Sequence, residues 1–243
     1  ILESDPSIRG IMFAHVLGNP PDMDRLMHLI EKHELIFIED ACDALGSLYD
    51  GRKLGSFGDI STCSFFPAHH MTMGEGGFVA TNNVRLNKTV TSIRDWGRAC
   101  YCNSNKPGNV PEAVYDHRYV FDEIGYNLKP LDLQAAMGLQ QLEKLPDFDA
   151  ARRKNFARLY EIFKPYEHYL HLPEANEKAD PCWFAFLMTV KEGAPFERGD
   201  IVSHFENNKI QTRSYFAGNI LAHPGYNHLA EPYGNLQDMF PVA

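Results

Sequence analysis

Short blocks of apolar and polar residues predict alternating strands and helices in the N-terminal part of the chain. The apolar run over residues 11–13 predicts a buried strand, and the run over residues 35–38 predicts another. Between them, Asp22 is suited to cap a helix that we expect to end at Lys32. Its apolar side chains recur at helical spacing: Met23, Leu26, Met27 and Ile30. A strand, a helix and a strand in succession form a βαβ unit, which indicates a parallel sheet.

The middle of the chain continues this pattern. Residues 60–66 and 78–81 predict two further strands, and residues 84–96 predict a helix. Apolar side chains at helical spacing predict another helix over residues 131–145. We expect Pro146 to break that helix, because proline removes a backbone hydrogen bond and clashes with the preceding turn.

The C-terminal part has a different organisation, with a predicted strand over residues 183–190 and a helix over residues 197–207. We therefore assign residues 1–150 to part of a large α/β domain, with a mainly parallel sheet and helices on both faces. Residues 151–243 are assigned to a linking helix and part of a smaller α+β domain. Because the chain starts with Ile1 and soon enters a strand, we expect it to be a piece of a longer protein.

Composition narrows the class of protein. Hydrophobic residues make up 44% and charged residues 23% of the chain, which is typical of a soluble globular protein. No stretch approaches the roughly 18–20 apolar residues of a membrane helix, so we expect no membrane partner. The net charge of −9 and the lack of a long basic cluster disfavour nucleic acid as a partner. Five cysteines without a signal peptide indicate a reducing compartment, which we take to be the cytoplasm.

Four short motifs carry the candidate chemistry: residues 39–43, 64–70, 74–77 and 125–127. Each alone has a structural explanation, since a carboxylate at a strand end caps helices and a glycine-rich stretch forms a tight turn. The adjacent His69 and His70 do not favour a metal site, because neighbours on an extended chain point in opposite directions. The combination is more specific than any single motif.

Together the motifs resemble the DegT/DnrJ/EryC1/StrS family of nucleotide-sugar aminotransferases, which has the pyridoxal-phosphate fold type I. In that family a strand ends in Glu-Asp-Ala-Ala-(Gln/His)-Ala, and Gly-Asp, Ser-Phe-x-x-x-Lys, Gly-Glu-Gly-Gly and Gly-(Tyr/Phe)-Asn follow. In this chain the matching segments are residues 39–44, 58–59, 64–69, 74–77 and 125–127. The resemblance covers the chain in order and implies that part of the site for the cofactor phosphate precedes it.

One departure from the family changes the implied chemistry. The lysine that binds the cofactor covalently falls on His69, and no lysine occurs between Lys53 and Lys88. An imidazole still transfers protons near neutral pH. Histidine at this position marks a subgroup of 3-dehydrases, and the flanking residues are similar to those of the dehydrases of CDP-linked sugars. The resemblance therefore implies 3-dehydration of a nucleotide-linked 4-keto-6-deoxyhexose with pyridoxamine or pyridoxal phosphate, for deoxysugar and lipopolysaccharide synthesis.

The resemblance also implies a role for each site residue. His69 is the catalytic group and moves a proton at the C4′ atom of the cofactor. Asp40 pairs with the ring nitrogen, Ser64 binds the phosphate, and Asp43 is a further cofactor-binding residue. Asn127 reaches the cofactor of the neighbouring subunit, which implies a homodimer with a shared active site. As a turn residue, Asn127 has an equally acceptable structural explanation.

The cysteines match part of an iron–sulfur motif. The CDP-sugar dehydrases hold a [2Fe–2S] cluster through Cys-x57-Cys-x-Cys-x7-Cys. Here 57 residues separate Cys42 from Cys100, and Cys102 follows after one more, but the fourth position is Val110. Because four thiolates are the usual requirement, the sequence leaves open whether a cluster is assembled. A cluster would imply an electron-transfer reductase as partner.

Three other functions stay open at this point. A cluster-free 3-dehydratase of GDP-linked sugars is one, and a nucleotide-sugar aminotransferase is another, disfavoured by His69. A non-catalytic paralogue that binds nucleotide sugars is the third. The joint presence of Asp40, Ser64, His69 and Asn127 argues against it, because binding alone does not need a proton-transfer residue.

Overall fold

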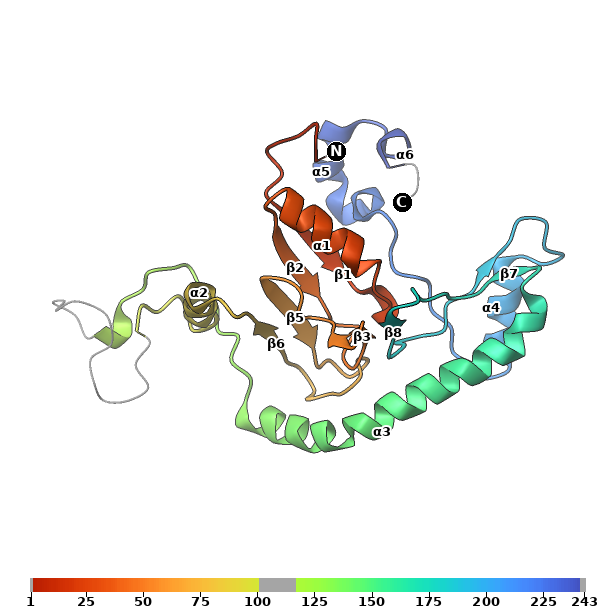
Figure 1. Ribbon diagram of the computed structural model, residues 1–243, viewed down its shortest axis with the longest axis horizontal. Helices are drawn as coiled ribbons and strands as arrows, with labels where there is room; N and C mark the ends of the chain where they lie inside the picture. The colour runs from red at the N-terminus through yellow and green to blue at the C-terminus, as the bar shows by residue number, and fades with distance from the viewer. Residues whose placement is uncertain (1, 101–116, 241–243) are drawn as a thin grey trace. The chain divides into compact units, whose positions relative to one another are not determined.

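The computed structural model describes residues 2–100 and 117–240 (Figure 1). They form two compact units, each of which is discontinuous in sequence. The first comprises Ile1–Ile162 and Glu174–Phe186, and the second comprises Phe163–Pro173 and Leu187–Ala243. The boundary that we placed after residue 150 lies inside one long helix.

The first unit contains most of the regular structure. Its strands are β1 (Gly10–Ala14), β2 (Ile36–Asp40), β3 (Leu48–Tyr49), β4 (Arg52–Lys53), β5 (Ile60–Ser64), β6 (Gly77–Ala80) and β8 (Ala179–Asp180). Its longer helices are α1 (Met23–Lys32), α2 (Val84–Arg94) and α3 (Asp132–Phe163), the last ending at the unit boundary. The second unit contains β7 (Leu170–His171), β9 (Thr189–Val190), α4 (Arg198–Asn207), α5 (Asn227–Ala230) and α6 (Leu236–Met239).

The main sheet has the strand order β1-β2-β5-β6. Strands β1, β2 and β5 are parallel, and β6 is antiparallel to β5. The predicted βαβ unit is therefore confirmed. Because parallel strands end at the same edge, Asp40 at the end of β2 lies at the carboxyl edge of the sheet.

Helix α1 begins and packs as its sequence predicts. The Asp22 side chain accepts the backbone N–H of Arg25 at 3.1 Å, which caps the helix. Its apolar face joins the core of the first unit, which also includes β2 and the small sheet β4-β3-β8. The most completely buried members of that core are Met23, Phe37, Ala44 and Tyr49.

The predicted break at Pro146 is wrong, because α3 continues from Asp132 to Phe163. An interior proline removes one backbone hydrogen bond and costs about 3 kcal/mol, and contacts beyond it hold the second half of the helix in place. Asp149 accepts the thiol of Cys182 at 3.2 Å, and Arg153 donates to Asp180 at 2.9 Å and to the carbonyl of Gly46 at 2.8 Å.

The predicted strand over residues 183–190 is also wrong, since its only strand residues are those of β9, which pairs with β7. The carbonyls of Trp183 and Phe184 accept hydrogen bonds from the Arg152 side chain. In this segment, hydrogen bonds from a distant side chain to the backbone carbonyls therefore take the place of hydrogen bonds to a neighbouring strand.

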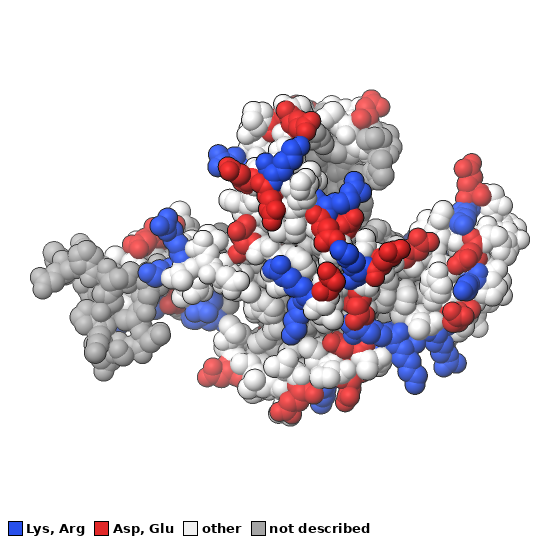
Figure 2. All heavy atoms as spheres, viewed as in Figure 1, with Lys and Arg blue, Asp and Glu red and all other residues white. Residues whose placement is uncertain are grey.

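Charged groups pair locally on the surface. Figure 2 shows acidic and basic side chains intermixed on the visible face. Examples are Lys178 with Asp24 at 2.5 Å and Lys32 with Glu3 at 3.1 Å. Within residues 2–100 and 117–240, no helix combines the length and apolar character needed to cross a membrane.

Candidate active site

The carboxyl edge of the main sheet carries two of the predicted cofactor residues. Asp40 lies opposite Thr62 of β5, and Ser64 is the last residue of that strand. Because side chains two residues apart on a strand share a face, Ser64 and Thr62 point to the same side of the sheet. His15 follows β1, and its backbone N–H donates to the carbonyl of Asp40 at 3.0 Å. The topology thus brings Asp40 and Ser64 to one edge.

His69 lies in the loop between β5 and β6, beside Asp43. Nδ1 of His69 is 3.5 Å from Oδ1 of Asp43, and the two side chains are 18% and 14% exposed. This Nδ1 atom is buried and has no hydrogen-bond partner in the described part of the chain. Asp43 also accepts the backbone N–H of Leu17 at 3.3 Å. The carboxylate of Asp43 is therefore placed to orient the imidazole.

The pKa of Asp43 reflects competing effects. Burial raises the pKa of this carboxyl group above its ordinary value. The hydrogen bond from Leu17 and the nearby His69 oppose the rise without cancelling it. Such a perturbed carboxyl group beside an imidazole is typical of a catalytic site.

A buried hydrogen-bonded pair, Glu39 and His15, lies behind this edge, and the sequence motifs assigned neither residue a role. Glu39 and His15 are 0% and 1% exposed, and Nε2 of His15 is 2.9 Å from Oε2 of Glu39. The same carboxylate accepts backbone N–H groups at 2.5–2.8 Å from three residues: Gly55, Phe57 and Gly58. Burial alone would raise the pKa of Glu39, but these hydrogen bonds lower it below the ordinary value. Glu39 therefore fastens the residue 55–58 loop to β2.

The two adjacent histidines have different surroundings. His70 is 3% exposed, and its Nε2 donates to the carbonyl of Cys182 at 2.8 Å. Burial lowers the pKa of His70, which keeps its ring neutral. The ring of Phe184 lies 5.5 Å from that of His69 and 6.0 Å from that of His70. His70 is thus an anchor of the loop that carries His69, a distinction that the sequence did not show.

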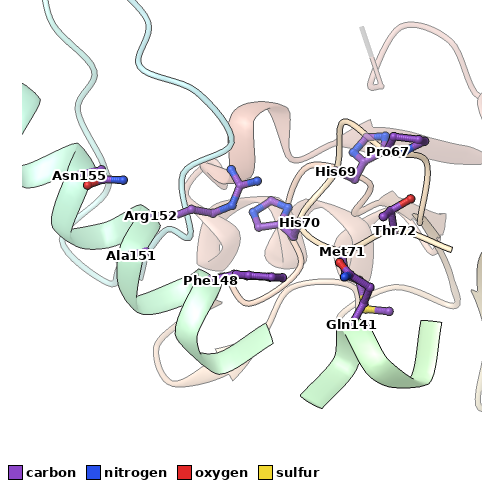
Figure 3. Close-up of a pocket in the computed structure, with 10 residues that line it drawn as sticks. All are labelled: Pro67, His69, His70, Met71, Thr72, Gln141, Phe148, Ala151, Arg152 and Asn155. Atoms are coloured by element: carbon purple, nitrogen blue, oxygen red, sulfur yellow. The ribbon is translucent and has the colours of Figure 1, made fainter. Parts of the chain in front are cut away.

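A cavity of about 470 Å³ opens beside His69 (Figure 3). The residue 67–72 loop lines one side, and α3 lines the other through residues that include Gln141, Phe148 and Arg152. Figure 3 shows Arg152 pointing from α3 toward His70. A cavity of this size accommodates part of a small-molecule ligand.

The described residues include only two of the three predicted cluster ligands, Cys42 and Cys100. Burial, followed by the hydrogen bond to Asp40, raises the pKa of the Cys42 thiol to about 12. Cys102 and Val110 lie outside the described residues. In the part that is described, no three His, Cys, Asp or Glu side chains form a group suited to a metal ion. The cluster through Cys42, Cys100 and Cys102 stays a prediction.

Asn127 lies in a turn that two glycines permit. It forms a backbone bridge with Asp95, and its side chain is exposed. Gly97, at φ +84°, and Gly125 lie back to back, so that a Cβ atom on either would overlap the backbone of the other strand of the turn. The reach of Asn127 into a neighbouring subunit stays a prediction.

The donor set at the sheet edge fits a pyridoxamine phosphate ring. A carboxylate such as that of Asp40 is able to pair with a protonated ring nitrogen, and a hydroxyl such as that of Ser64 is able to bind a phosphate. His69 adds an imidazole that lines the cavity and whose buried Nδ1 faces Asp43. These residue types match the chemistry of the cofactor.

Comparison with known proteins agrees with this fold. Residues 4–242 match the DegT/DnrJ/EryC1/StrS aminotransferase family, and the chain belongs to that family. It has the α/β fold of the pyridoxal-phosphate-dependent members, as the sequence predicted. The lipopolysaccharide biosynthesis protein RfbH of Salmonella typhimurium is 44% identical over 227 residues, covering 89% of this chain and 52% of the relative. The dTDP-4-dehydro-2,6-dideoxy-D-glucose 3-dehydratase of Saccharopolyspora spinosa is 44% identical over 232 residues, covering 91% and 50%.

A solved structure shares the architecture. The Escherichia coli GDP-4-keto-6-deoxy-D-mannose-3-dehydratase with bound hydrated pyridoxal phosphate is 28% identical, with a TM-score of 0.77. The match covers 93% of this chain and 57% of that chain. The chain spans about half the length of the curated relatives it matches.

Proposed function

We propose that the full-length protein removes the C3 hydroxyl group of a nucleotide-linked 4-keto-6-deoxyhexose, with pyridoxamine phosphate as cofactor. One observation carries the proposal. By the sequence resemblance, His69 occupies the loop position that holds lysine in the aminotransferases, and it lies beside Asp43. An imidazole there suits proton transfer and does not form the covalent cofactor link of an aminotransferase. The 3-dehydratases among the relatives support the same reaction.

Each site residue has a role that follows from its chemistry. When bound, the cofactor supplies an amine and a ring that accepts electrons. Asp40 would keep the ring nitrogen protonated, and Ser64 would bind the phosphate group. His69 would hold and move the proton at C4′, with Asp43 orienting its imidazole. Asn127 would contact the cofactor of a second subunit in a homodimer.

The identity of the substrate depends on which nucleotide is linked to the sugar. The sequence favours a CDP-linked sugar, whereas the 3-dehydratases among the relatives are named for dTDP-linked and GDP-linked sugars. The shared feature is a nucleotide-linked hexose with a C4 ketone, and we propose this class. The expected setting is deoxysugar and lipopolysaccharide synthesis, in line with the name of the Salmonella relative.

Product analysis tests the proposal. The full-length protein is incubated with pyridoxamine phosphate and the CDP-, dTDP- and GDP-linked 4-keto-6-deoxyhexoses. We expect a 3-deoxy product from one of them. A 4-amino sugar instead, together with a covalent adduct on borohydride treatment with pyridoxal phosphate, would identify an aminotransferase. No conversion of any of the three, even with a chemical reductant present to replace an electron-transfer partner, would favour a binding paralogue.

The redox partner depends on the cluster. If Cys42, Cys100 and Cys102 bind iron, an electron-transfer reductase is the expected partner. Anaerobic reconstitution with an iron and sulfide assay decides this, because a cluster that survives Cys42→Ser would exclude the proposed ligands. Absence of iron would favour the cluster-free dehydratases. Pyridoxal phosphate is trapped with glutamate in the structure of one GDP-sugar dehydratase, so glutamate is the amine donor to test.

A further inference from the structure

Two consecutive arginines on α3 differ in how their charges are balanced. Arg153 pairs with Asp180 at 2.9 Å. Arg152 forms no ion pair with a carboxylate in the described part of the chain. Its Nη1 donates instead to the carbonyls of Trp183 at 3.3 Å and Phe184 at 3.2 Å. Arg152 is thus a half-buried cation whose hydrogen bonds go to neutral acceptors.

This arrangement leaves Arg152 suited to an anion. A partly desolvated cation without a directly hydrogen-bonded counter-ion is less stable than a paired one, and an anionic ligand would supply that hydrogen-bonded partner. The two carbonyls fix the guanidinium, so its remaining N–H donors keep their direction. A fixed guanidinium binds carboxylate and phosphate groups through paired hydrogen bonds.

The cavity beside His69 gives an anion access to this group. Arg152 lines it together with His69 and His70, and Gln141 and Asn155 add neutral polar groups. Among the described residues that line the cavity there is no carboxylate. A ligand in the cavity of about 470 Å³ would therefore meet one fixed positive charge and no carboxylate among the lining residues.

We propose that Arg152 binds an anionic group of a ligand that lies beside His69, either a phosphate or a carboxylate. The inference deepens the proposed function and rests on it for the identity of the ligand. A phosphate would come from the diphosphate of the nucleotide sugar. A carboxylate would come from an amino acid that donates the amine of the cofactor. Either would place the reacting molecule next to His69.

Calorimetric binding to the full-length protein tests this inference. The probes are CDP, dTDP and GDP for the phosphate source and L-glutamate for the carboxylate source. We expect Arg152→Gln to weaken at least one of them by about tenfold or more, because a hydrogen bond to a charged group is lost. Loss confined to the nucleotides identifies the phosphate, and loss confined to glutamate identifies the carboxylate. Lys154→Gln, on an exposed position of the same helix, is the matched control and should leave every affinity unchanged.

Two results would overturn the proposal: no binding of any probe to the wild type at millimolar concentration, or equal affinities in wild type and Arg152→Gln. If Arg152→Gln does not fold, phenylglyoxal modification of the wild type replaces the variant. A saturating probe should then slow modification of Arg152 and leave the exposed Arg158 unaffected. Unprotected Arg152 would contradict the proposal. Anion binding without a 3-deoxy product would contradict the proposed function alone.

Discussion

Glu39 and Asp40 are neighbours on β2, yet they have different roles. Side chains alternate along a strand, so Glu39 points into the protein while Asp40 stands at the sheet edge. Glu39 binds His15 and the backbone of the residue 55–58 loop. The sequence indicated Asp40 through its place at a strand end. It did not indicate the role of Glu39, because the partners of that carboxylate come from distant segments.

Asp40→Asn should leave the fold nearly intact and slow catalysis. The backbone N–H of Cys42 donates to Oδ1 of Asp40 at 3.0 Å, and the amide oxygen of asparagine can accept the same bond. A neutral side chain no longer stabilises a protonated ring nitrogen, so we expect kcat to fall by about 10²-fold or more. Steady-state kinetics and thermal unfolding of the full-length protein check both parts. Turnover close to wild type would remove Asp40 from the site.

Glu39→Gln should destabilise the protein in a pH-dependent way. The amide group of glutamine would place its N–H donors against the backbone N–H donors that surround the Glu39 carboxylate. We therefore expect the free energy of unfolding at pH 7 to fall by about 3 kcal/mol or more. The pKa of Glu39 is lowered in the folded state from its ordinary value of 4.5. Its stabilising contribution is therefore complete above that value and is lost as the pH falls through the folded pKa.

Urea unfolding of wild type and Glu39→Gln across pH 7 to 3 measures this effect. The difference in unfolding free energy should be constant near neutral pH and shrink below about pH 4.5. Glu31→Gln, an exposed position on α1, is the control and should differ from wild type by less than about 0.5 kcal/mol. A gap that widens on acidification would contradict the assignment of Glu39 as a stabilising carboxylate.

At the scale of helices and strands, the sequence correctly predicted those elements that local interactions stabilise. The βαβ unit and the Asp22 cap follow from periodicity and capping, and the structure confirms both. The predictions failed where distant side chains decide the outcome. Arg152 donates hydrogen bonds to backbone carbonyls of the segment that we predicted to be a strand. The contacts of Asp149 and Arg153 stabilise the part of α3 that follows Pro146. Which of the two histidines lies beside Asp43 and which anchors the loop also depended on a distant carbonyl.

The turn that holds Asn127 gives a prediction about backbone packing. A Cβ atom at Gly97 would collide with the carbonyl of Glu123, in addition to the strain of its positive φ. Gly51 has a similar φ of +74°, but a Cβ atom there would meet nothing within 4 Å, so Gly51→Ala isolates the strain. We expect Gly51→Ala to cost about 1–2 kcal/mol and Gly97→Ala clearly more. Urea unfolding compares them, and equal losses would show that the turn has room to adjust.

At the scale of the molecule, the first half of α3 and the residue before it expose an apolar surface. Leu131, Leu133 and Leu139 are 68%, 76% and 64% exposed. Large exposed apolar patches mark interaction surfaces, and the proposed homodimer supplies a partner. We expect the full-length protein to sediment as a dimer and Leu133→Glu to shift it toward monomer. Lys154→Glu, farther along α3, is the control. A wild type that is monomeric at micromolar concentration would contradict the shared active site.

Proton transfer by His69 is the central claim, and a pair of histidine variants tests it most directly. His69→Asn and His70→Gln are compared with wild type in formation of the 3-deoxy product by the full-length protein with pyridoxamine phosphate. We expect a loss of at least about 10²-fold for His69→Asn, because general acid–base catalysis contributes that much. His70→Gln, which keeps a donor for the Cys182 carbonyl, should stay within about tenfold of wild type. A folded His69→Asn variant with wild-type product formation would contradict the claim.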